Sequence, residues 1–469
     1  MNVMLHLGLG SFHRAHQAVY LHALIASGDT RWSIAGGNTR ADMTETIDAL
    51  VRQGGSYTLE TISPTGEHRY ETIRSIQRIF PHSPDLAGLI AQGADPATRI
   101  ISFTVTEAGY YLDEHNRLDW STFADLRADL EAARAGHPGS TVYGALTAIL
   151  RARMRAHGEA VTLLCCDNLR HNGNRSRSGL LQFIEAIGDT DLLAWVQTHT
   201  SSPNAMVDRI TPRPTPEVRE RVLAATGVDD GAAVMGEDFI QWVIEDDFIA
   251  GRPAWETVGV EMVNSVDAYE EAKIRLLNAT HSCIAWAGTL VGYLYIHEGT
   301  QDAAIRQMAF DYVTRDTIPV LDTPESPCPI NLAHYRDVVL ARFANPAICD
   351  TNQRVAMDGF SKIPGFIAPT LRERLARGES ISAVAMLPAL FLTYLQRWHA
   401  GLIPYTYQDQ AMNADVAHAM CADPDPVAVF GADALLWGEL AGDARLVAAL
   451  RDAMGRVAAF VAQHDVAHA

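Results

Sequence analysis

The segment V-M-L-H-L-G-L-G-S-F-H at residues 3–13 joins an apolar stretch to a glycine turn and the start of a helical pattern. Residues 3–7 have the length and character of a buried strand, and residues 12–27 have the periodicity of a helix. Gly8 suits a tight turn, and Gly10 lets a pyrophosphate approach the backbone at a helix N-terminus. This order predicts a dinucleotide-binding fold, although a plain strand–helix turn fits two glycines equally well.

Further apolar segments at residues 32–35, 100–106 and 161–166 read as strands, and helical patterns separate them. Such an alternation is typical of a parallel sheet that is covered by helices on both faces. Ligands of these sheets bind at the carboxyl ends of the strands. We therefore expect the binding region to include residues 8–13, 106–111 and 167–174.

The character of the chain changes near residue 269, where long helical patterns begin to dominate. These patterns predict an α/β protein with two domains. Residues 1–265 form a Rossmann-type, doubly wound domain, and residues 266–469 form a mainly helical domain that carries the substrate and the chemistry. The expected helices lie at residues 269–293, 301–315, 331–343, 380–399 and 446–463.

Composition narrows the class of protein. The net charge of −19 opposes binding to nucleic acid or to an anionic membrane surface. The sequence shows neither a secretion signal at its N-terminus nor an apolar run of about 20 residues that would span a membrane. Its six cysteines are scattered and contain no CxxC pair. These features predict a cytoplasmic protein that binds neither nucleic acid nor membrane.

The second predicted strand runs into A-G-G-N-T-R-A-D at residues 35–42, where an acid that holds the adenosine ribose is expected. Asp42 is a slightly displaced candidate, and Arg40 equally suits a 2′-phosphate, so the residues leave NAD and NADP open. Solvation of both side chains at the surface is the alternative. His13 replaces the third glycine of the usual motif. The predicted cofactor contacts are Gly8, Gly10, Phe12, His13, Arg14, Asp42, Thr106 and Glu107.

The stretch E-E-A-K-I-R-L-L-N-A-T-H at residues 270–281 places polar side chains in an otherwise apolar helical pattern. Burial of an amine is costly without a partner or a task, and it favours the neutral form. Lys273 is therefore a candidate general base. With Lys273 at 0° on an ideal α-helix, Glu270 lies at about 60° and His281 at about 80°. Asn278 lies at about 140°, so the four share less than half of the circumference.

Oxidation of a secondary alcohol needs a base, donors for the developing alkoxide and a hydride acceptor. Lys273 suits the base, Asn278 an alkoxide donor and His281 a donor that orients either. Glu270 suits a proton relay to solvent, and Asn168 at a strand end adds a second polar group. Two alternatives remain open: His281 as the base with Lys273 as an anchor, and a salt-bridged helix with a hydrogen-bonded core histidine.

Two loops are unusually polar. M-V-D-R-I-T-P-R-P at residues 206–214 carries Asp208, and T-N-Q-R-V-A-M-D-G-F-S-K-I-P at residues 351–364 carries Arg354 and Lys362. A polyhydroxylated substrate needs donors and acceptors beyond its reacting carbon, and these side chains can supply them. Exposed loop charges are the alternative.

Five segments match one known family in order and from end to end. Their Lys-x4-Asn-x2-His spacing is specific, and the chain resembles the polyol-specific long-chain dehydrogenases, the mannitol dehydrogenase family. The segments are G-L-G-S-F-H-R-A-H-Q (8–17), C-D-N-L-R-H-N-G (166–173), M-V-D-R-I-T-P-R-P (206–214), K-I-R-L-L-N-A-T-H (273–281) and D-G-F-S-K-I-P (358–364).

The resemblance implies a monomer whose site lies between a Rossmann domain and a helical domain. It implies oxidation of a polyol to a ketose with NAD and without zinc, D-arabinitol and D-xylulose being the expected pair. The family's base falls on Lys273 and its relay on Glu270. Its oxyanion-hole asparagines fall on Asn168 and Asn278, and its orienting histidine falls on His281. Substrate-hydroxyl contacts fall on Asp208, Arg354 and Lys362.

Other activities remain open. Arg354 and Lys362 would also grip a sugar-acid carboxylate, as in a uronate reductase, and a mannitol 2-dehydrogenase would use the same base. An aldolase would use Lys273 as a Schiff base but has no need of the dinucleotide turn. A sensor that binds NAD without turnover has no need of a buried base. The sequence holds no tight Cys/His cluster, so no metal is expected.

Overall fold

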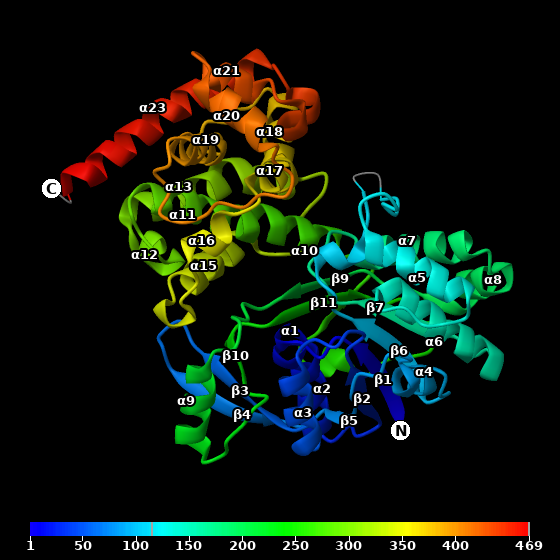
Figure 1. Cartoon of the computed structure of the whole chain (residues 1–469). Coiled ribbons are helices and arrows are strands. Elements are labelled where there is room, and N and C mark those ends of the chain that lie inside the picture. Colours follow the sequence, from blue (N-terminus) through cyan, green and yellow to red (C-terminus); the bar gives the residue numbers. More distant parts are fainter. Residues whose placement is uncertain (114–115, 468–469) are drawn as a thin grey trace. The chain divides into compact units, whose positions relative to one another are not determined.

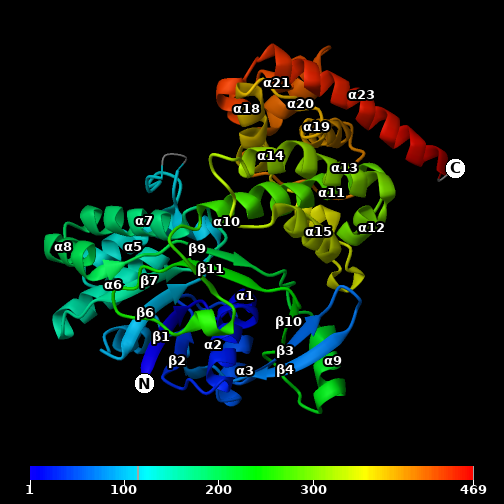
Figure 2. The same ribbon diagram turned by 180° about the vertical axis from the view of Figure 1, so that it is seen from behind.

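The computed structural model describes residues 1–113 and 116–467, with the side chains of residues 107, 108 and 465–467 outside that description. It divides into two compact units (Figures 1 and 2). Unit 1 comprises Met1–Ser63 and Glu67–Asp267, and unit 2 comprises Pro64–Gly66 and Ala268–Ala469.

The centre of unit 1 is a six-stranded sheet in the order β5-β2-β1-β6-β7-β8, and every neighbouring pair is parallel. The strands appear in blue to green in Figure 1. Parallel pairing along the whole sheet confirms the predicted Rossmann-type architecture. The strands are β1 (Asn2–Leu7), β2 (Trp32–Gly37), β5 (Ile76–Phe80), β6 (Thr98–Phe103), β7 (Val161–Cys165) and β8 (Thr200–Ser201).

Both faces of this sheet are covered, because successive side chains of a strand point to opposite sides. Met4 and Ile100 belong to a core cluster with residues of α2 and α3. Their neighbours Leu5 and Ile101 belong to a second cluster with residues of α4 to α8. The helices of unit 1 are α1 (Ser11–Ala15), α2 (Gln17–Ala26), α3 (Thr44–Arg52), α4 (Ala87–Gly93), α5 (Ala124–Arg134), α6 (Val142–Ala156), α7 (Asn172–Ile187), α8 (Thr190–His199) and α9 (Pro216–Thr226), with 3₁₀ turns η1 (Glu107–Tyr110) and η2 (Trp255–Val258).

The structure corrects two predicted elements. The helix expected at residues 12–27 is broken at His16, whose φ of −129° and ψ of −87° separate α1 from α2. The strand expected at residues 100–106 ends at Phe103, because Asp167 accepts hydrogen bonds from the amides of Val105 and Thr106 and holds them outside the sheet.

Two small sheets were not predicted. One has the order β10-β3-β4 and the other β12-β11-β9. The β4 strand H-R-Y-E-T-I is mostly exposed, so its sequence lacks the apolar run that marks a buried strand. The strands are β3 (Tyr57–Ile62), β4 (His68–Ile73), β9 (Ala205–Asp208), β10 (Val234–Glu237), β11 (Gln241–Glu245) and β12 (Glu261–Val263).

Unit 2 is built from helices, as predicted. All twelve residues of α11 except His281 are buried, and α11 packs against α12, α13, α16 and α19. No helix in the described residues is long and apolar enough to cross a bilayer. The elements are α10 (Asp267–Ala272), η3 (Lys273–Asn278), α11 (Ala279–Leu290), α12 (Ile296–Gln301), α13 (Ala303–Tyr312), η4 (Val313–Thr317), α14 (Ile318–Leu321), α15 (Leu332–Phe343), η5 (Pro346–Ile348), α16 (Asn352–Ala356), α17 (Gly359–Lys362), η6 (Ile363–Ile367), α18 (Ala368–Ala376), α19 (Met386–His399), α20 (Ala414–Ala422), α21 (Pro426–Gly431), α22 (Ala434–Trp437), η7 (Gly438–Leu440) and α23 (Ala444–Ala467).

Candidate functional site

The turn after β1 uses its two glycines for different reasons. Gly8 has φ of +103°, and a Cβ there would lie 2.4 Å from the carbonyl oxygen of Thr104. At Gly10 a Cβ would meet only the Gly8 oxygen, at 4.0 Å, so the described protein atoms leave space for a side chain. A ligand that approaches the backbone is the physical reason for glycine at that place. The turn therefore fits a dinucleotide pyrophosphate.

Hydrogen bonds within the turn decide which amides remain for a phosphate. The Leu9 amide donates to Asn38 Oδ1 at 2.8 Å, and the Gly10 amide donates to the Gly8 oxygen at 2.7 Å. The first amides of a helix have no intrahelical acceptor. Those of Ser11, Phe12 and His13 at the start of α1 are thus the groups that a phosphate would meet.

His13 and Arg14 support the turn from inside the protein. His13 is fully buried and stacks on His6, with ring centroids 3.5 Å apart. Arg14 is 1% exposed, and its guanidinium donates to the carbonyl oxygens of Leu9 and Ala232. The side chains of these two residues are enclosed by the protein. A predicted cofactor contact at either residue would therefore have to come from its backbone.

The buried histidine pair should make the folded state acid-sensitive. Burial lowers the pKa of His6 to about 3 and that of His13 well below 6.5. Below pH 6.5 the unfolded chain binds more protons than the folded one, so the free energy of unfolding falls with decreasing pH. Each histidine contributes a slope that approaches about 1.4 kcal/mol per pH unit. We expect His13→Leu to reduce the pH dependence of the free energy of unfolding by the contribution of one histidine, as measured by urea unfolding between pH 6.5 and 5.

The exposed His82 offers a matched control, because His82→Leu removes an imidazole from the surface. That variant should keep the wild-type dependence on pH. A slope unchanged by His13→Leu would contradict a neutral, buried His13.

Asp42 lies in the segment that follows β2 and is exposed. The side-chain Nδ2 of Asn38 donates to two atoms of Asp42, the backbone oxygen and Oδ1, both at 3.4 Å. Because Asn38 also binds the Leu9 amide, one side chain connects the glycine turn to the predicted ribose acid. The geometry is compatible with the displaced acid that the sequence suggested.

Arg40, the other candidate at this strand end, is already engaged. Its Nη2 donates to the Tyr111 hydroxyl at 2.7 Å and lies 3.0 Å from Asp125 Oδ2. Tyr111 also donates to Asp125, at 2.7 Å. The charge of Arg40 is thus balanced by a carboxylate of unit 1, which reduces its capacity to serve a 2′-phosphate.

The ends of β6 and β7 are held together by Asp167, which the sequence analysis placed in the binding region without giving it a role. Its carboxylate accepts from the amides of Val105 at 2.8 Å and Thr106 at 3.0 Å, and from the Tyr110 hydroxyl at 2.5 Å. This network fixes Thr106 at φ of +68° and leaves the next residue, Asn168, exposed. The side chain of Glu107 lies outside the described residues.

Asp208 is the last residue of β9 and is 5% exposed. It pairs with Gln241 in the antiparallel register of β9 and β11. The next residue, Arg209, donates from Nε and Nη2 to the carbonyl oxygen of Glu237, at 2.8 and 2.6 Å. The strand end that carries Asp208 is therefore rigid, as a substrate contact requires.

In unit 2, Lys273 and Glu270 are buried, with exposures of 7% and 4%. Lys273 opens a π-helical segment, η3, that ends at Asn278. The assumption of a continuous α-helix over this stretch was wrong. A π turn acts as one inserted residue and rotates everything downstream by about 100°. Relative to Lys273, Asn278 then lies at about 40° and His281 at about −20°, so the polar set occupies a narrower arc than predicted.

His281 belongs to a charged group that the sequence analysis described only in part. Its Nε2 lies 3.0 Å from Asp350 Oδ2, and its ring stacks on Phe343 at 4.2 Å. Arg354 Nε and Nη2 donate to the two carboxylate oxygens of Asp350 at 2.6 and 2.5 Å. Burial lowers the pKa of His281, and the Asp350 carboxylate offsets this only in part. The imidazole is therefore neutral at pH 7.

Asp350 is the member that sequence reasoning missed. Burial alone would raise its pKa, but the hydrogen bonds and charges of His281 and Arg354 lower it well below the usual value. The Asp350 carboxylate next to Nε2 favours the ring proton on that nitrogen. The orienting role predicted for His281 stays a prediction. An acid that precedes the 351–364 loop by one residue was the available signal.

Lys362, predicted to contact substrate, donates from Nζ to the Val355 oxygen at 2.6 Å. Its charge is among those that act on His281, so it lies in the same part of unit 2. Lys273 and Lys362 are the only lysines among 37 Lys and Arg residues. A chain that otherwise uses arginine throughout keeps lysine at two predicted site positions, a compositional signal that the sequence analysis did not use.

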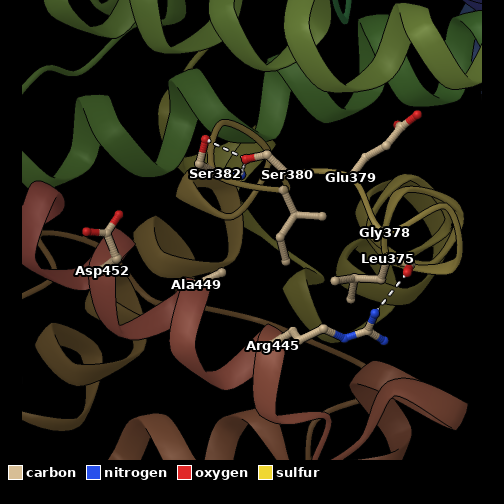
Figure 3. A pocket seen from close by; sticks show the side chains of 9 residues that line it. Leu375, Gly378, Glu379, Ser380, Ser382, Arg445, Ala449 and Asp452 are labelled. Carbon is tan, nitrogen blue, oxygen red and sulfur yellow. Dashed lines mark hydrogen bonds between the residues drawn. The ribbon is translucent and has the colours of Figure 1, made fainter.

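A separate pocket of about 230 Å³ lies where the end of α18 meets α23 (Figure 3). Arg445 donates from Nη1 to the Leu375 oxygen at its rim, and Nη2 of the same residue pairs with Asp443. None of the predicted site residues lines this pocket.

Comparison with known proteins covers nearly the whole chain. Residues 2–257 match the model of the mannitol dehydrogenase Rossmann domain, and residues 265–458 match that of the mannitol dehydrogenase C-terminal domain. A D-arabinitol 4-dehydrogenase of Ralstonia nicotianae is 60% identical over 98% of this chain and 97% of its own length. One of Klebsiella pneumoniae is 53% identical over 97% of both chains.

A solved structure is also similar to this chain over nearly its whole length. Pseudomonas fluorescens mannitol 2-dehydrogenase, in a ternary complex with NAD and D-mannitol, superposes with a TM-score of 0.81 at 34% identity. The match covers 98% of this chain and 94% of that one.

Proposed function

Because the chain belongs to the mannitol dehydrogenase family of NAD-dependent polyol dehydrogenases, we propose that it oxidises D-arabinitol to D-xylulose with Lys273 as the general base. The observation that carries the base assignment is a lysine 7% exposed at the first residue of a π turn. The observation that carries the substrate is 60% identity to a D-arabinitol 4-dehydrogenase over nearly the full length.

Each residue has one task in the proposed reaction. The hydroxyl proton of the polyol passes to the neutral ε-amine of Lys273, and the C–O bond gains double-bond character as the carbon loses hydride. Bound NAD supplies the hydride acceptor. The amides of Asn168 and Asn278 donate to the oxygen as its negative charge develops. Glu270, one turn before Lys273, receives the proton and passes it to solvent.

The orientation of the substrate falls to the charged group of unit 2 and to Asp208. His281 orients a substrate hydroxyl, and the Asp350 carboxylate beside Nε2 holds the ring in place. Lys362 and Asp208 add a donor and an acceptor for further hydroxyls. Arg354 supports this arrangement through Asp350.

Two relatives of the reaction compete with the proposal: oxidation of D-mannitol and reduction of a uronate. A uronate carboxylate needs an available cation, whereas Arg354 is bound through two hydrogen bonds to Asp350. This pairing argues against Arg354 as that cation and leaves Lys362, which the D-fructuronate assay tests. It does not separate D-arabinitol from D-mannitol, for which the similarity of the chain to its relatives is the argument.

A substrate panel tests the proposal. D-arabinitol, D-mannitol and xylitol are offered with NAD, D-fructuronate is offered with NADH, and absorbance of NADH is followed with and without EDTA. We expect the highest kcat/KM with D-arabinitol and no effect of the chelator. A clear preference for the uronate, or for mannitol, would refute the proposed substrate, and loss of activity in EDTA would refute the metal-free mechanism.

The Arg40–Asp125 pair makes a prediction about the cofactor. Asp125→Asn removes the negative charge that balances Arg40, so the guanidinium becomes available to a 2′-phosphate. We expect kcat/KM for NADP to rise about tenfold, equivalent to about 1.4 kcal/mol, with a change below about threefold for NAD. Steady-state kinetics with both cofactors measure this.

A matched control and a reversal sharpen that test. Asp229→Asn breaks a comparable surface pair with Arg219 and should leave the preference unchanged. Arg40→Ala in the Asp125→Asn background should abolish the gain. If it does not, Arg40 is not the group that meets the 2′-phosphate.

A further inference from the structure

The π segment that carries Lys273 redirects a backbone amide away from the carbonyl that it would reach in an α-helix. The Ala279 amide donates to the Ile274 oxygen, five residues back, and to the Leu276 oxygen, three residues back. In an α-helix the same amide would donate to the Arg275 oxygen, four residues back. The Ala279 amide therefore does not serve the Arg275 carbonyl, and a buried carbonyl without a donor costs about 1–3 kcal/mol.

A tyrosine from another helix supplies the missing donor. The hydroxyl of Tyr312, at the end of α13, lies 3.3 Å from the Arg275 oxygen and 3.2 Å from the Leu276 oxygen. It also lies 2.6 Å from Thr280 Oγ1. Tyr312 and Thr280 are 1% and 2% exposed, so water does not compete for these bonds. The single proton of this hydroxyl thus lies within hydrogen-bond distance of the two carbonyls at the centre of the π turn.

Ion pairs of the Arg275 side chain also hold the same turn. Arg275 is 7% exposed, and its Nε donates to Glu271 at 2.6 Å. Its Nη1 and Nη2 donate to Glu373 on α18 at 3.0 and 2.8 Å. The π turn is therefore clamped from both sides, by a hydroxyl on its carbonyls and by carboxylates on its arginine.

The register of the helix makes this clamp relevant to chemistry. With the π turn, Asn278 and His281 lie within about 40° of Lys273 around the helix axis. If the segment relaxed to a continuous α-helix, Asn278 would move to about 140° and His281 to about 80°. The alkoxide donor would then lie about 100° further from the base around the helix axis.

We propose that Tyr312, supported by Thr280, is a positioning residue that holds the π turn and so keeps Lys273 and Asn278 on one face for catalysis. This inference rests on the proposed function of Lys273. It assigns to Tyr312 a role in the rate of the chemical step, beyond its contribution to packing.

Tyr312→Phe is the sharpest test, since it removes one hydroxyl and keeps the ring. In the full-length enzyme with NAD and D-arabinitol, we expect kcat to fall about 10- to 100-fold, because a displacement near 1 Å costs about that much. NAD affinity should stay within about twofold. The primary kinetic isotope effect on kcat with C4-deuterated D-arabinitol should rise, because a misplaced base slows the chemical step itself. Thr280→Val should show the same trend with a smaller loss.

Thr300→Val is the matched control. Thr300 is also buried in unit 2 and donates to a helix carbonyl, that of Ile296 at 2.8 Å, but it lies on α12. It should lose stability without a change in kcat or in the isotope effect.

The outcomes are distinguishable. A wild-type enzyme that turns over no polyol refutes the proposed function. An active wild type, with Tyr312→Phe folded and equal to Thr300→Val in kcat and isotope effect, refutes the positioning role. Should Tyr312→Phe fail to fold, Thr280→Val alone decides, because it weakens the same hydrogen-bond group from the other end.

Discussion

Exchange of Lys273 for methionine is expected to lower kcat about 10²- to 10⁴-fold, the range that a positioned general base supplies. Methionine keeps the apolar length of the side chain and removes the amine, so the buried site is not left with a cavity. NAD affinity should persist, because the predicted pyrophosphate contacts lie in unit 1 at Gly8 and Gly10. Stopped-flow and steady-state measurement of NADH formation with D-arabinitol, together with NAD titration, test this.

The second lysine of the chain is the natural comparison. Lys362→Met should raise KM for the polyol about tenfold with a smaller change in kcat, because Lys362 is proposed to bind a hydroxyl that does not react. Near-normal turnover by Lys273→Met would refute the base assignment and return His281 as the candidate. Equal kinetic losses in both variants would show that the two amines act alike, contrary to the proposed roles.

Having only two lysines also allows a direct measurement on the unmodified enzyme. Incorporation of [13Cε]lysine gives two side-chain resonances, and the Lys362→Met variant assigns them. Titration of the Lys273 resonance with pH, with and without NAD, shows whether the amine is neutral where the enzyme is active. An amine that stays protonated throughout the active range would contradict the proposed base.

Exchange of Asn278 for leucine has the second largest expected effect. Removal of one donor to a developing oxyanion costs about 10²- to 10³-fold in kcat. Leucine has a similar volume and cannot donate, so it isolates the hydrogen bond. KM for D-arabinitol should change by less than about threefold, since the oxygen carries full negative charge only on the way to the transition state. Asn168→Leu should behave in the same way.

Asn413→Ala provides the control for asparagine loss. Asn413 is the N-cap of α20 and accepts from the amides of Asp415 and Val416. Its loss should cost about 1 kcal/mol of stability and leave kcat unchanged. If Asn278→Leu raised KM without lowering kcat, Asn278 would be a binding residue and not an oxyanion donor.

Much of the fold could be predicted from local patterns. β1, β2 and β7 are short apolar runs that lie between helical patterns, and the hydrophobic effect acts on them directly. The turn at Gly8 could be predicted because only glycine takes a φ of +103° there without strain. The expected helices of unit 2 were found with shifted bounds, because their apolar faces follow the helical period. The one expected at residues 380–399 begins at Met386, and the one expected at residues 301–315 is α13 followed by the π segment η4.

What failed was decided by partners distant in sequence. β4 is mostly exposed and forms because it pairs with β3, so its own residues do not mark it. The periodicity predicted a helix that continues through His16, but the helix is interrupted there. The Nε2 atom of His16 instead bonds with the backbone oxygen of Gln241, at 2.8 Å. From the sequence, Arg40 is a candidate ligand of a 2′-phosphate. In the structure it is paired with Asp125, which is 85 residues away in the sequence.

By itself the sequence determined the class of fold, the dinucleotide turn and the identity of the polar residues from Glu270 to His281. These follow from period, glycine stereochemistry and residue type, which are local properties. Only the tertiary structure decided how those residues face one another. The π turn exists where the Tyr312 hydroxyl of another helix reaches the carbonyls of Arg275 and Leu276. No pattern within residues 270–281 reports a donor that arrives from another helix.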